Sequence, residues 1–213
     1  MAQSADWYFD FVSPFAYLQF QQLAKLPPDL VIHYKPVLFA GLLDHWGQKG
    51  PAEIAAKRRF TYRFVQWKAG ELGISLKFPQ QHPFNPIPFL RVAVSLGATQ
   101  NAVATIFDFL WKEGNAPSAA DALPELGKRL AVDDISLRVA DPTVKGKLMQ
   151  NGQDALAQGV FGVPTFVVHR ELFWGSDSLE MFAAYLRDRN LFQSAEMLRI
   201  SDLPLGQMRK AVK

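Results

Sequence analysis

Apolar and polar positions along the chain predict strands near its two ends and helices between them. Residues 6–12 (DWYFDFV) and 30–34 (LVIHY) are apolar and aromatic enough for buried strands. A helix is expected from Pro14 to about Lys25, because serine is a favoured N-cap and Ser13 directly precedes a proline, which helices tolerate best at their first position. This order of strand, helix and strand is that of a βαβ unit.

Helical periodicity replaces the strand pattern over residues 42–158, where convincing strands are few. It predicts helices at residues 55–72, 86–96, 99–111, 121–130 and 143–157. After Gly159, strands are expected again at 165–168 and 172–174, and a last helix follows them. The chain is therefore predicted to be an α/β protein whose strand-containing part is split by a helical insertion.

A proline stands just before the strand expected at 165–168, where it would normally prevent a strand from starting. The run Gly162-Val163-Pro164-Thr165 makes sense there if the Val163–Pro164 peptide is cis, because a cis bond turns the chain tightly. The backbone N–H and C=O of Val163 would then be left free to pair with an extended peptide.

The composition narrows the kinds of ligand. Of the 213 residues, 49% are hydrophobic, enough for one compact unit with a sizeable core. The net charge of +3 comes from basic residues that are scattered, apart from Lys57-Arg58-Arg59 and the C-terminal end, which favours a small anionic molecule over nucleic acid. No apolar run is long enough to span a bilayer and no signal peptide is expected, so a membrane is not an expected partner.

The chain contains no cysteine, which excludes disulfide exchange by the protein itself and fits a cytoplasmic location. Its four histidines, His33, His45, His82 and His169, are isolated and show no metal-ligand spacing, so no metal is expected. The 17 phenylalanines and five tryptophans are expected mostly in the core, with some of them walling a pocket for an aromatic substrate.

A cis-proline loop opposite the start of the first helix resembles the thioredoxin superfamily, but this helix start carries Ser13 and no cysteine. With serine there, the chain resembles the 2-hydroxychromene-2-carboxylate isomerases and their relatives, the kappa-class glutathione transferases. The resemblance covers most of the chain through five motifs in order, at 10–17, 36–42, 46–53 with Lys57 downstream, 82–86 and 173–177. It implies a thioredoxin-like domain formed by residues 4–39 and 159–189, an inserted all-helical domain at 40–158, and a C-terminal tail at 190–213.

The resemblance implies glutathione as the cofactor. Ser13 would hydrogen-bond its thiolate, and the Val163 backbone, exposed by Pro164, would pair with its cysteinyl part. Ser176 and Asp177 would hold the γ-glutamyl group. From local pattern alone, Ser13 is equally an N-cap, Pro164 a structural turn, and the 175–177 run a turn that starts the last helix.

The same resemblance places Lys57 on the glycyl carboxylate of glutathione and Gln48 near the same tripeptide, although Lys57 also fits a solvated basic face. Asn85 and Arg91 are candidates to line the pocket and meet an aromatic carboxylate, with a turn residue as the alternative for Asn85. Many relatives have an arginine after the aspartate of the last motif, where this chain has Ser178. Weak glutathione binding, or preference for another thiol, is the expected consequence.

The implied activity is a glutathione-dependent cis–trans isomerisation of 2-hydroxychromene-2-carboxylate or a similar aromatic unsaturated acid, within aromatic compound catabolism. The thiolate of glutathione would add reversibly to the substrate, so that a former double bond can rotate. Two alternatives remain open. One is a kappa-like glutathione transferase that conjugates electrophiles, and the other is a non-catalytic thioredoxin-fold protein that binds thiols or peptides. A homodimer is expected because relatives pair.

Overall fold

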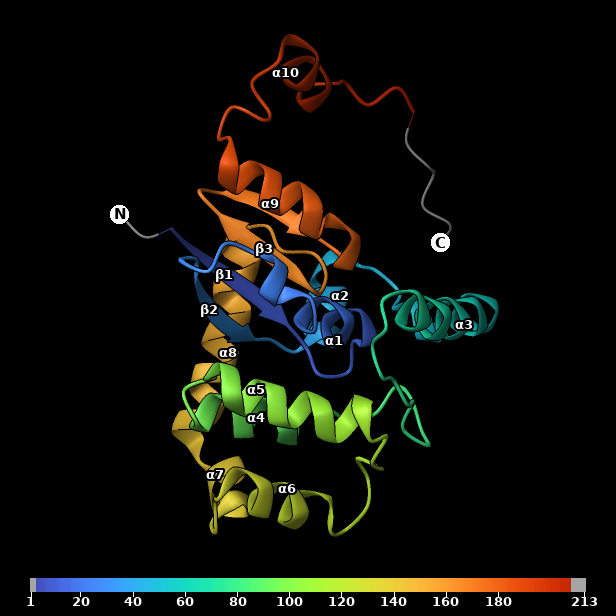
Figure 1. Cartoon of the computed structure of the whole chain (residues 1–213), viewed down its shortest axis with the longest axis vertical. Coiled ribbons are helices and arrows are strands. Elements are labelled where there is room, and N and C mark those ends of the chain that lie inside the picture. The colour runs from blue at the N-terminus through green and yellow to red at the C-terminus, as the bar shows by residue number, and fades with distance from the viewer. Residues whose placement is uncertain (1–2, 208–213) are drawn as a thin grey trace.

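A mixed four-stranded sheet lies at the centre of the computed structural model, which describes residues 3–207 (Figure 1). The strands are β1 (Ser4–Phe9), β2 (Val31–Pro36), β3 (Thr165–Val168) and β4 (Glu171–Trp174), arranged in the order β2-β1-β3-β4. β1 pairs with β2 in parallel and with β3 antiparallel, and β3 pairs antiparallel with β4. The two ends of the chain therefore build one sheet, as the hydrophobic pattern predicts.

Helices connect and cover this sheet. Their bounds are α1 (Pro14–Phe20), α2 (Phe39–Trp46), α3 (Ala55–Glu71), α4 (Ile87–Ser95), α5 (Gln100–Phe107), α6 (Ala122–Leu130), α7 (Ile135–Ala140), α8 (Pro142–Ala157), α9 (Leu179–Arg187) and α10 (Ala195–Ser201). Short 3-10 turns cover Leu23–Lys25, Pro51–Glu53 and Ser176–Ser178, and a π-helical turn covers Asp108–Lys112. Figure 1 shows α4 and α5 below the sheet, α6 and α7 farther below, and α9 above it.

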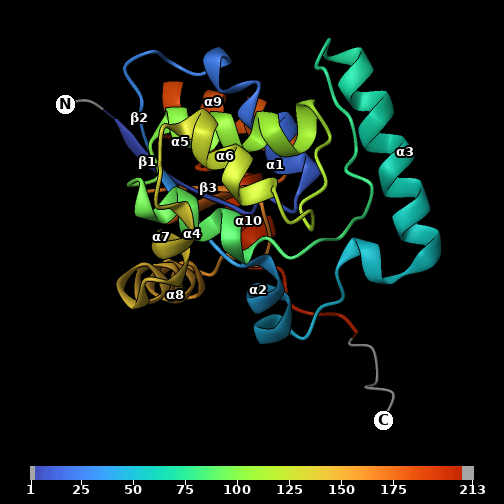
Figure 2. The same ribbon diagram turned by 90° about the horizontal axis from the view of Figure 1, so that it is seen from below.

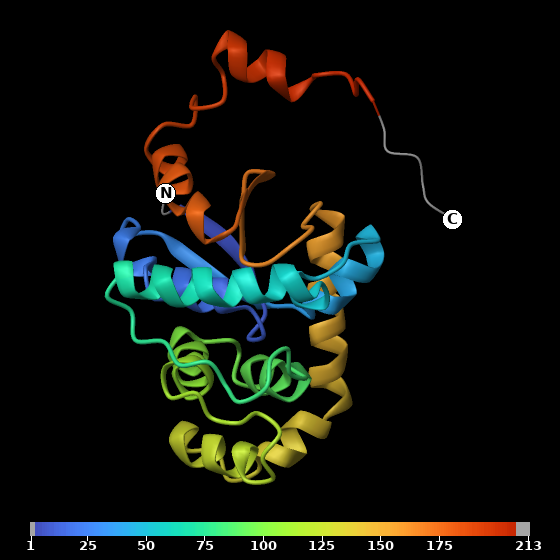
Figure 3. The ribbon, with the colours of Figure 1, turned by 90° about the vertical axis from the view of Figure 1, so that its right-hand side faces the viewer.

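Alternate residues of β1 face opposite sides of the sheet, as the strand period requires. Trp7 and Phe9 stack at 4.5 Å between ring centroids and belong to the large core that α1, α5 and α9 complete. Tyr8 faces the other side, where α2 and α8 cover a smaller cluster. Figure 3 shows α8 rising along one side of the molecule from the helical insertion to the sheet.

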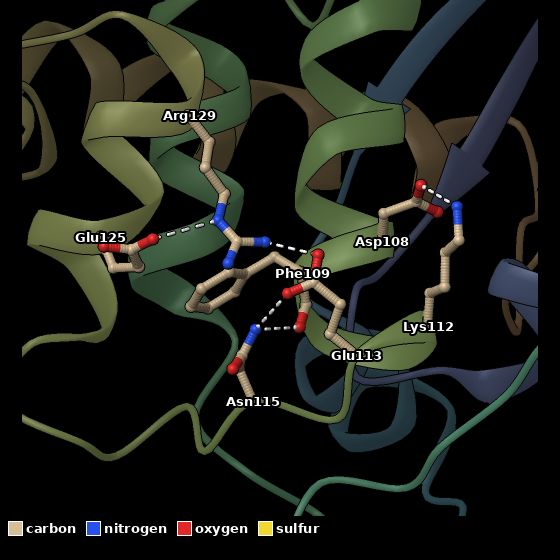
Figure 4. A network of polar contacts seen from close by, with 7 residues as sticks. All are labelled: Asp108, Phe109, Lys112, Glu113, Asn115, Glu125 and Arg129. Atoms are coloured by element: carbon tan, nitrogen blue, oxygen red, sulfur yellow. Dashed lines mark hydrogen bonds and ion pairs between the residues drawn. The ribbon is translucent and has the colours of Figure 1, made fainter.

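The helical insertion has its own polar links on its outer face. Arg129 of α6 pairs with Glu113 after the π-helical turn and with Glu125, and its guanidinium carbon lies 4.9 Å from the ring centroid of Phe109 (Figure 4). Lys112 pairs separately with Asp108 at 3.1 Å. These groups are largely exposed, so they orient α6 more than they stabilise the fold.

The predicted α/β class with a helical insertion is confirmed, and so is the cis Val163–Pro164 peptide; His82–Pro83 is cis as well. The first helix is shorter than expected, because it ends at Phe20 and a 3-10 turn replaces its last residues. The pattern of apolar and polar residues did not predict α2, α7 and α10. Within residues 3–207, no helix has the length and apolar character needed to cross a bilayer, and no cluster of potential metal ligands occurs.

The missed helix α2 has no N-cap within its own sequence, since Leu38 occupies that position. Its first N–H group, that of Phe39, instead donates to Oδ2 of Asp10 at 2.8 Å, from the end of β1. A cap supplied from 29 residues away leaves no local signature, which explains why the pattern gave no helix there. The proposed division into domains at residues 39 and 159 stays a prediction, and α8 contacts both β2 and the helices of the insertion.

Candidate functional site

A cavity of about 380 Å³ opens beside the start of α1. Its walls come from the β1–α1 turn, α2 with the segment that follows it, α3, the loop before α4 and the cis-proline loop. The side chains that line it are mainly apolar. Those used below are Asp10, Val12, Ser13, Phe15, Phe39, Gln48, Lys49, Glu53, Lys57, Tyr62, His82, Phe84, Phe161, Val163 and Trp174.

Ser13 lines this cavity and is the N-cap of α1. Its Oγ accepts a hydrogen bond from the N–H of Ala16 at 3.2 Å, with Pro14 at the first helical position. The predicted cap is therefore confirmed. A serine hydroxyl that accepts one bond still has its own proton to donate, so the cap and a contact to a bound anion are compatible. The side chain is 7% exposed, at the edge of the cavity.

Asp10 is a fully buried carboxyl group beneath Ser13. Oδ1 accepts from the N–H of Val12 at 3.0 Å, and Oδ2 accepts from the N–H of Phe39 at 2.8 Å. Burial raises the pKa of Asp10 to about 7, although both hydrogen bonds act in the opposite direction. The sequence analysis placed Asp10 only within a motif. A carboxylate inside an otherwise apolar run was the signal that could have singled it out.

His82 joins three segments of the cavity wall. Its Nε2 lies 2.7 Å from the carbonyl oxygen of Val12, and its Nδ1 lies 2.7 Å from Oη of Tyr62. Tyr62 Oη is also 2.7 Å from the main-chain oxygen of His82. Burial lowers the pKa of this histidine. The sequence analysis treated it as isolated because its partners stand 20 and 70 residues away.

The cis-proline loop forms the wall opposite α1. Val163 lines the cavity, and among residues 3–207 its main-chain N–H and C=O have no hydrogen-bond partner. Pro164 does not line the cavity, and its carbonyl accepts from the N–H of Gly175 at 2.8 Å. Gly162 lets the ring of Trp174 lie against the loop, because a Cβ at Gly162 would lie 2.5 Å from Nε1 of Trp174 and would displace that ring. Extended main-chain pairing is therefore available at Val163.

The remaining candidates fall into two groups. Gln48 and Lys57 are exposed residues that line the cavity. Figure 2 shows α3, which carries Lys57, along the edge of the molecule beside α1. Ser176 and Asp177 do not line the cavity and form the 3-10 turn that begins two residues after Trp174, at the cavity rim.

Asn85 and Arg91 are not brought to the cavity. Oδ1 of Asn85 accepts from the N–H of Ile87 at 3.1 Å, which matches the turn alternative. Nη1 of Arg91 donates to the carbonyl of Val139 at 3.1 Å, toward α7, and its buried Nε has no partner. Neither side chain is positioned to meet a ligand beside Ser13.

Comparison with known proteins identifies the family. The family model of the DsbA-like thioredoxin domain matches residues 5–187. A 2-hydroxychromene-2-carboxylate isomerase of Pseudomonas putida is 32% identical over 83% of this chain and 90% of its own length. Glutathione S-transferase kappa 2 of Caenorhabditis elegans is 24% identical over 85% of this chain and 91% of its own length.

Solved structures agree with these relatives. The structure of a 2-hydroxychromene-2-carboxylate isomerase superposes with a TM-score of 0.79 at 27% identity, and the match covers 91% of this chain and 98% of that one. With 32% identity to a relative over most of both chains, the chain belongs to the 2-hydroxychromene-2-carboxylate isomerase family, an isomerase branch of the DsbA-like thioredoxin domain.

Proposed function

We propose that this isomerase acts on 2-hydroxychromene-2-carboxylate or a similar aromatic unsaturated acid and requires glutathione. One observation carries the proposal: the hydroxyl of Ser13, the unpaired main chain of Val163 and the cationic side chain of Lys57 line a single, mostly apolar cavity. The first two groups match the cysteinyl part of a tripeptide, and the third matches its glycyl carboxylate.

The residues present fit glutathione. Val163 has a main-chain donor and acceptor with no partner among residues 3–207, which an extended peptide satisfies. Gln48 lines the same cavity as Lys57. A tripeptide reaches roughly 10 Å when extended, so we assign its γ-glutamyl end to Ser176 and Asp177, beyond Trp174.

Bound glutathione supplies a thiolate whose reversible addition allows a former double bond of the substrate to rotate. The hydroxyl of Ser13 would donate a hydrogen bond to the sulfur while keeping its proton, which favours the charged form of the thiol. The aromatic side chains Phe15, Phe39, Phe84 and Phe161 line the rest of the cavity and suit an aromatic ring. The charge of Lys49 complements a substrate carboxylate.

Ser178 stands where many relatives have an arginine, and its surroundings bear on affinity. Its hydroxyl donates to the carbonyl of Gly175 at 2.9 Å, and the side chain is buried. It therefore offers no charged contact to the γ-glutamyl group. We expect weaker glutathione binding than an arginine at this position would give.

The test is an absorbance assay of the purified protein with 2-hydroxychromene-2-carboxylate, with and without glutathione. Glutathione-dependent formation of the open-chain isomer is expected. Conjugation of a chloro-nitro aromatic compound without isomerisation would favour the transferase alternative. Absence of both reactions together with retained glutathione binding would favour the non-catalytic alternative. Pairing with a second copy stays a prediction from the resemblance, and a cytoplasmic location stays a prediction from the absence of cysteine.

The role of Ser13 is tested by Ser13→Ala, for which the chain offers a matched control. Thr99 caps α5 as Ser13 caps α1, accepting from the N–H of Ala102 at 3.4 Å, and it does not line the cavity. Ser13→Ala and the control Thr99→Ala are each expected to lower the free energy of unfolding by about 0.5–2 kcal/mol. Only Ser13→Ala should also lower turnover and raise the pKa of bound glutathione, followed by thiolate absorbance. Equal turnover in the two variants would remove Ser13 from the mechanism.

A further inference from the structure

Tyr62 and His82 form a hydrogen-bonded pair in the cavity wall that the proposed binding of glutathione does not use. Tyr62 belongs to α3 and His82 to the loop before α4, and both line the same cavity as Ser13. Oη of Tyr62 lies 2.7 Å from Nδ1 of His82 and 2.7 Å from the main-chain oxygen of the same residue. The other ring nitrogen, Nε2, lies 2.7 Å from the carbonyl oxygen of Val12.

The two side chains can stay hydrogen-bonded to each other in two protonation states of the histidine. A carbonyl only accepts, so Nε2 carries a proton toward Val12, and in the neutral ring Nδ1 accepts from the Tyr62 hydroxyl. When Nδ1 is protonated, it donates to Oη of Tyr62, whose own proton turns to the main-chain oxygen of His82. The hydrogen bond between the two side chains is therefore kept in both states, and only the main-chain oxygen of His82 gains or loses the Tyr62 proton when the ring changes its charge.

The surroundings set the resting state of the pair. Burial lowers the pKa of His82 below its ordinary 6.5, so the ring is neutral at pH 7. Burial raises the pKa of Tyr62, which keeps the phenol protonated, although the charge of Arg58 opposes this. The other titratable or charged side chains of the cavity wall are Asp10, Lys49, Glu53 and Lys57. At pH 7 the pair therefore consists of a neutral His82 ring, which can accept a proton, hydrogen-bonded to the protonated phenol of Tyr62.

We propose that Tyr62 and His82 carry the proton that must move when the hemiketal ring of the substrate opens, an inference that rests on the proposed function. The hemiketal hydroxyl gives its proton to Tyr62 Oη while the tyrosine proton passes to Nδ1 of His82. The bond between the hemiketal carbon and the ring oxygen breaks, its electron pair stays on that oxygen, and the carbon becomes a carbonyl. Tyr62 then returns a proton to the phenolate and recovers its own from His82, so protons and electrons balance.

Two variants separate this role from a purely structural one. Tyr62→Phe removes the hydroxyl that contacts the substrate, and we expect kcat to fall about 10²-fold, in the range of general acid–base catalysis. His82→Gln keeps a donor for the carbonyl of Val12 and an acceptor for Tyr62 but cannot hold a proton. Tyr8→Phe is the control, because Tyr8 also has a hydrogen-bonded hydroxyl, held by Gln158 at 2.6 Å, but does not line the cavity.

The pH dependence gives the sharper readout. In the wild type, kcat should fall as the pH drops through the pKa of His82, because an imidazolium cannot accept the hemiketal proton. The His82→Gln variant should have a lower kcat, and this kcat should no longer fall at acidic pH (the acidic limb of the profile). A second readout uses the protein without glutathione: titration of His82 followed by NMR should show a lower pKa in Tyr62→Phe, since the imidazolium then lacks its acceptor at Nδ1.

The outcomes distinguish the two proposals. A wild type inactive with glutathione and substrate would overturn the proposed function and this proton route with it. An active wild type with unchanged kcat in Tyr62→Phe and His82→Gln would overturn the route alone. The pair would have a purely structural role if both variants were slow, His82→Gln kept the fall of kcat at acidic pH, and Tyr62→Phe left the pKa of His82 unchanged. If Tyr62→Phe fails to fold by circular dichroism, the pH profile of His82→Gln decides the matter.

Discussion

The buried carboxyl group of Asp10 should make the protein less stable as the pH rises, and a single substitution should remove this pH dependence. The carboxyl group is 0% exposed, and burial raises its pKa from 3.8 to about 7. Between these two values the unfolded chain has lost the proton that the folded protein keeps. Stability contributed by the protonated group is thus complete below pH 4 and is lost as the pH rises to about 7.

The magnitude follows from the same pKa. Since a tenfold change in proton affinity is worth about 1.4 kcal/mol, ionisation of Asp10 makes folding roughly 4 kcal/mol less favourable above pH 7 than below pH 4. Asp10→Asn has nearly the same shape and no charge, so it removes this pH dependence. In the wild type the two carboxyl oxygens accept from the N–H groups of Val12 and Phe39. The asparagine has a single amide oxygen at this position, so one of these two N–H groups would face the amide NH₂ group and lose its acceptor. That loss costs about 1–3 kcal/mol at every pH.

The two effects predict a crossover. Below pH 5 the Asp10→Asn variant should be less stable than the wild type by about 1–3 kcal/mol. Above pH 8 it should be equally stable or more stable, because the wild type then holds a buried charge. Urea denaturation at several pH values from 4.5 to 8.5 measures this, with the exposed Asp29→Asn as a control for removing a carboxylate. A stability difference that stays constant across that range would refute the assigned pKa of Asp10.

Two further substitutions test how the site is held. Gly162→Ala should displace the ring of Trp174 from the rim of the cavity, because the new Cβ would lie 2.5 Å from Nε1 of Trp174. The affinity for glutathione should fall, while the free energy of unfolding should change by less than about 1 kcal/mol. An unchanged affinity would contradict the proposed tripeptide site. Gln19→Met should cost about 1–3 kcal/mol, because the buried amide accepts from Nε1 of Trp7 at 2.6 Å and donates to the carbonyl of Gly175 at 2.8 Å. Urea denaturation measures this loss of stability, with a substitution at an exposed position, Gln21→Met, as the control. Equal denaturation midpoints for the two variants would contradict the structural role assigned to Gln19.

Features that depend on neighbouring residues could be predicted from the sequence. Ser13-Pro14 predicted both a helix start and its cap, and the run before Thr165 predicted a cis peptide bond that the structure contains. The apolar and aromatic content of residues 6–12 predicted β1, and the helical periodicity of 55–72 predicted α3, each to within a few residues. In each case the physical cause, a cap, a fixed dihedral angle or a buried face, lies within a few residues of its effect.

Features that depend on distant partners could not be predicted. The start of α2 is capped by Asp10, and His82 finds its partners in Val12 and Tyr62, so nothing near either site marks the contact. Arg91 also depends on a distant partner. It was a candidate to meet an aromatic carboxylate, and its guanidinium instead donates to the carbonyl of Val139 within the insertion.

The origin of the cavity walls connects the fold to substrate choice. Ser13, Val163 and Trp174 come from the parts of the chain that build the sheet, whereas Lys57, Tyr62, His82 and Phe84 come from the helical insertion. The groups that we assign to the sulfur of glutathione thus belong to the thioredoxin-like part, which this chain shares with proteins of other activities. The pair that we assign to the protons of the substrate, Tyr62 and His82, belongs to the insertion, whereas the aromatic side chains that suit the substrate ring come from both parts of the chain. Substitutions at Ser13 should therefore lower the turnover of every substrate, whereas substitutions at Phe84 should change which aromatic acid is turned over.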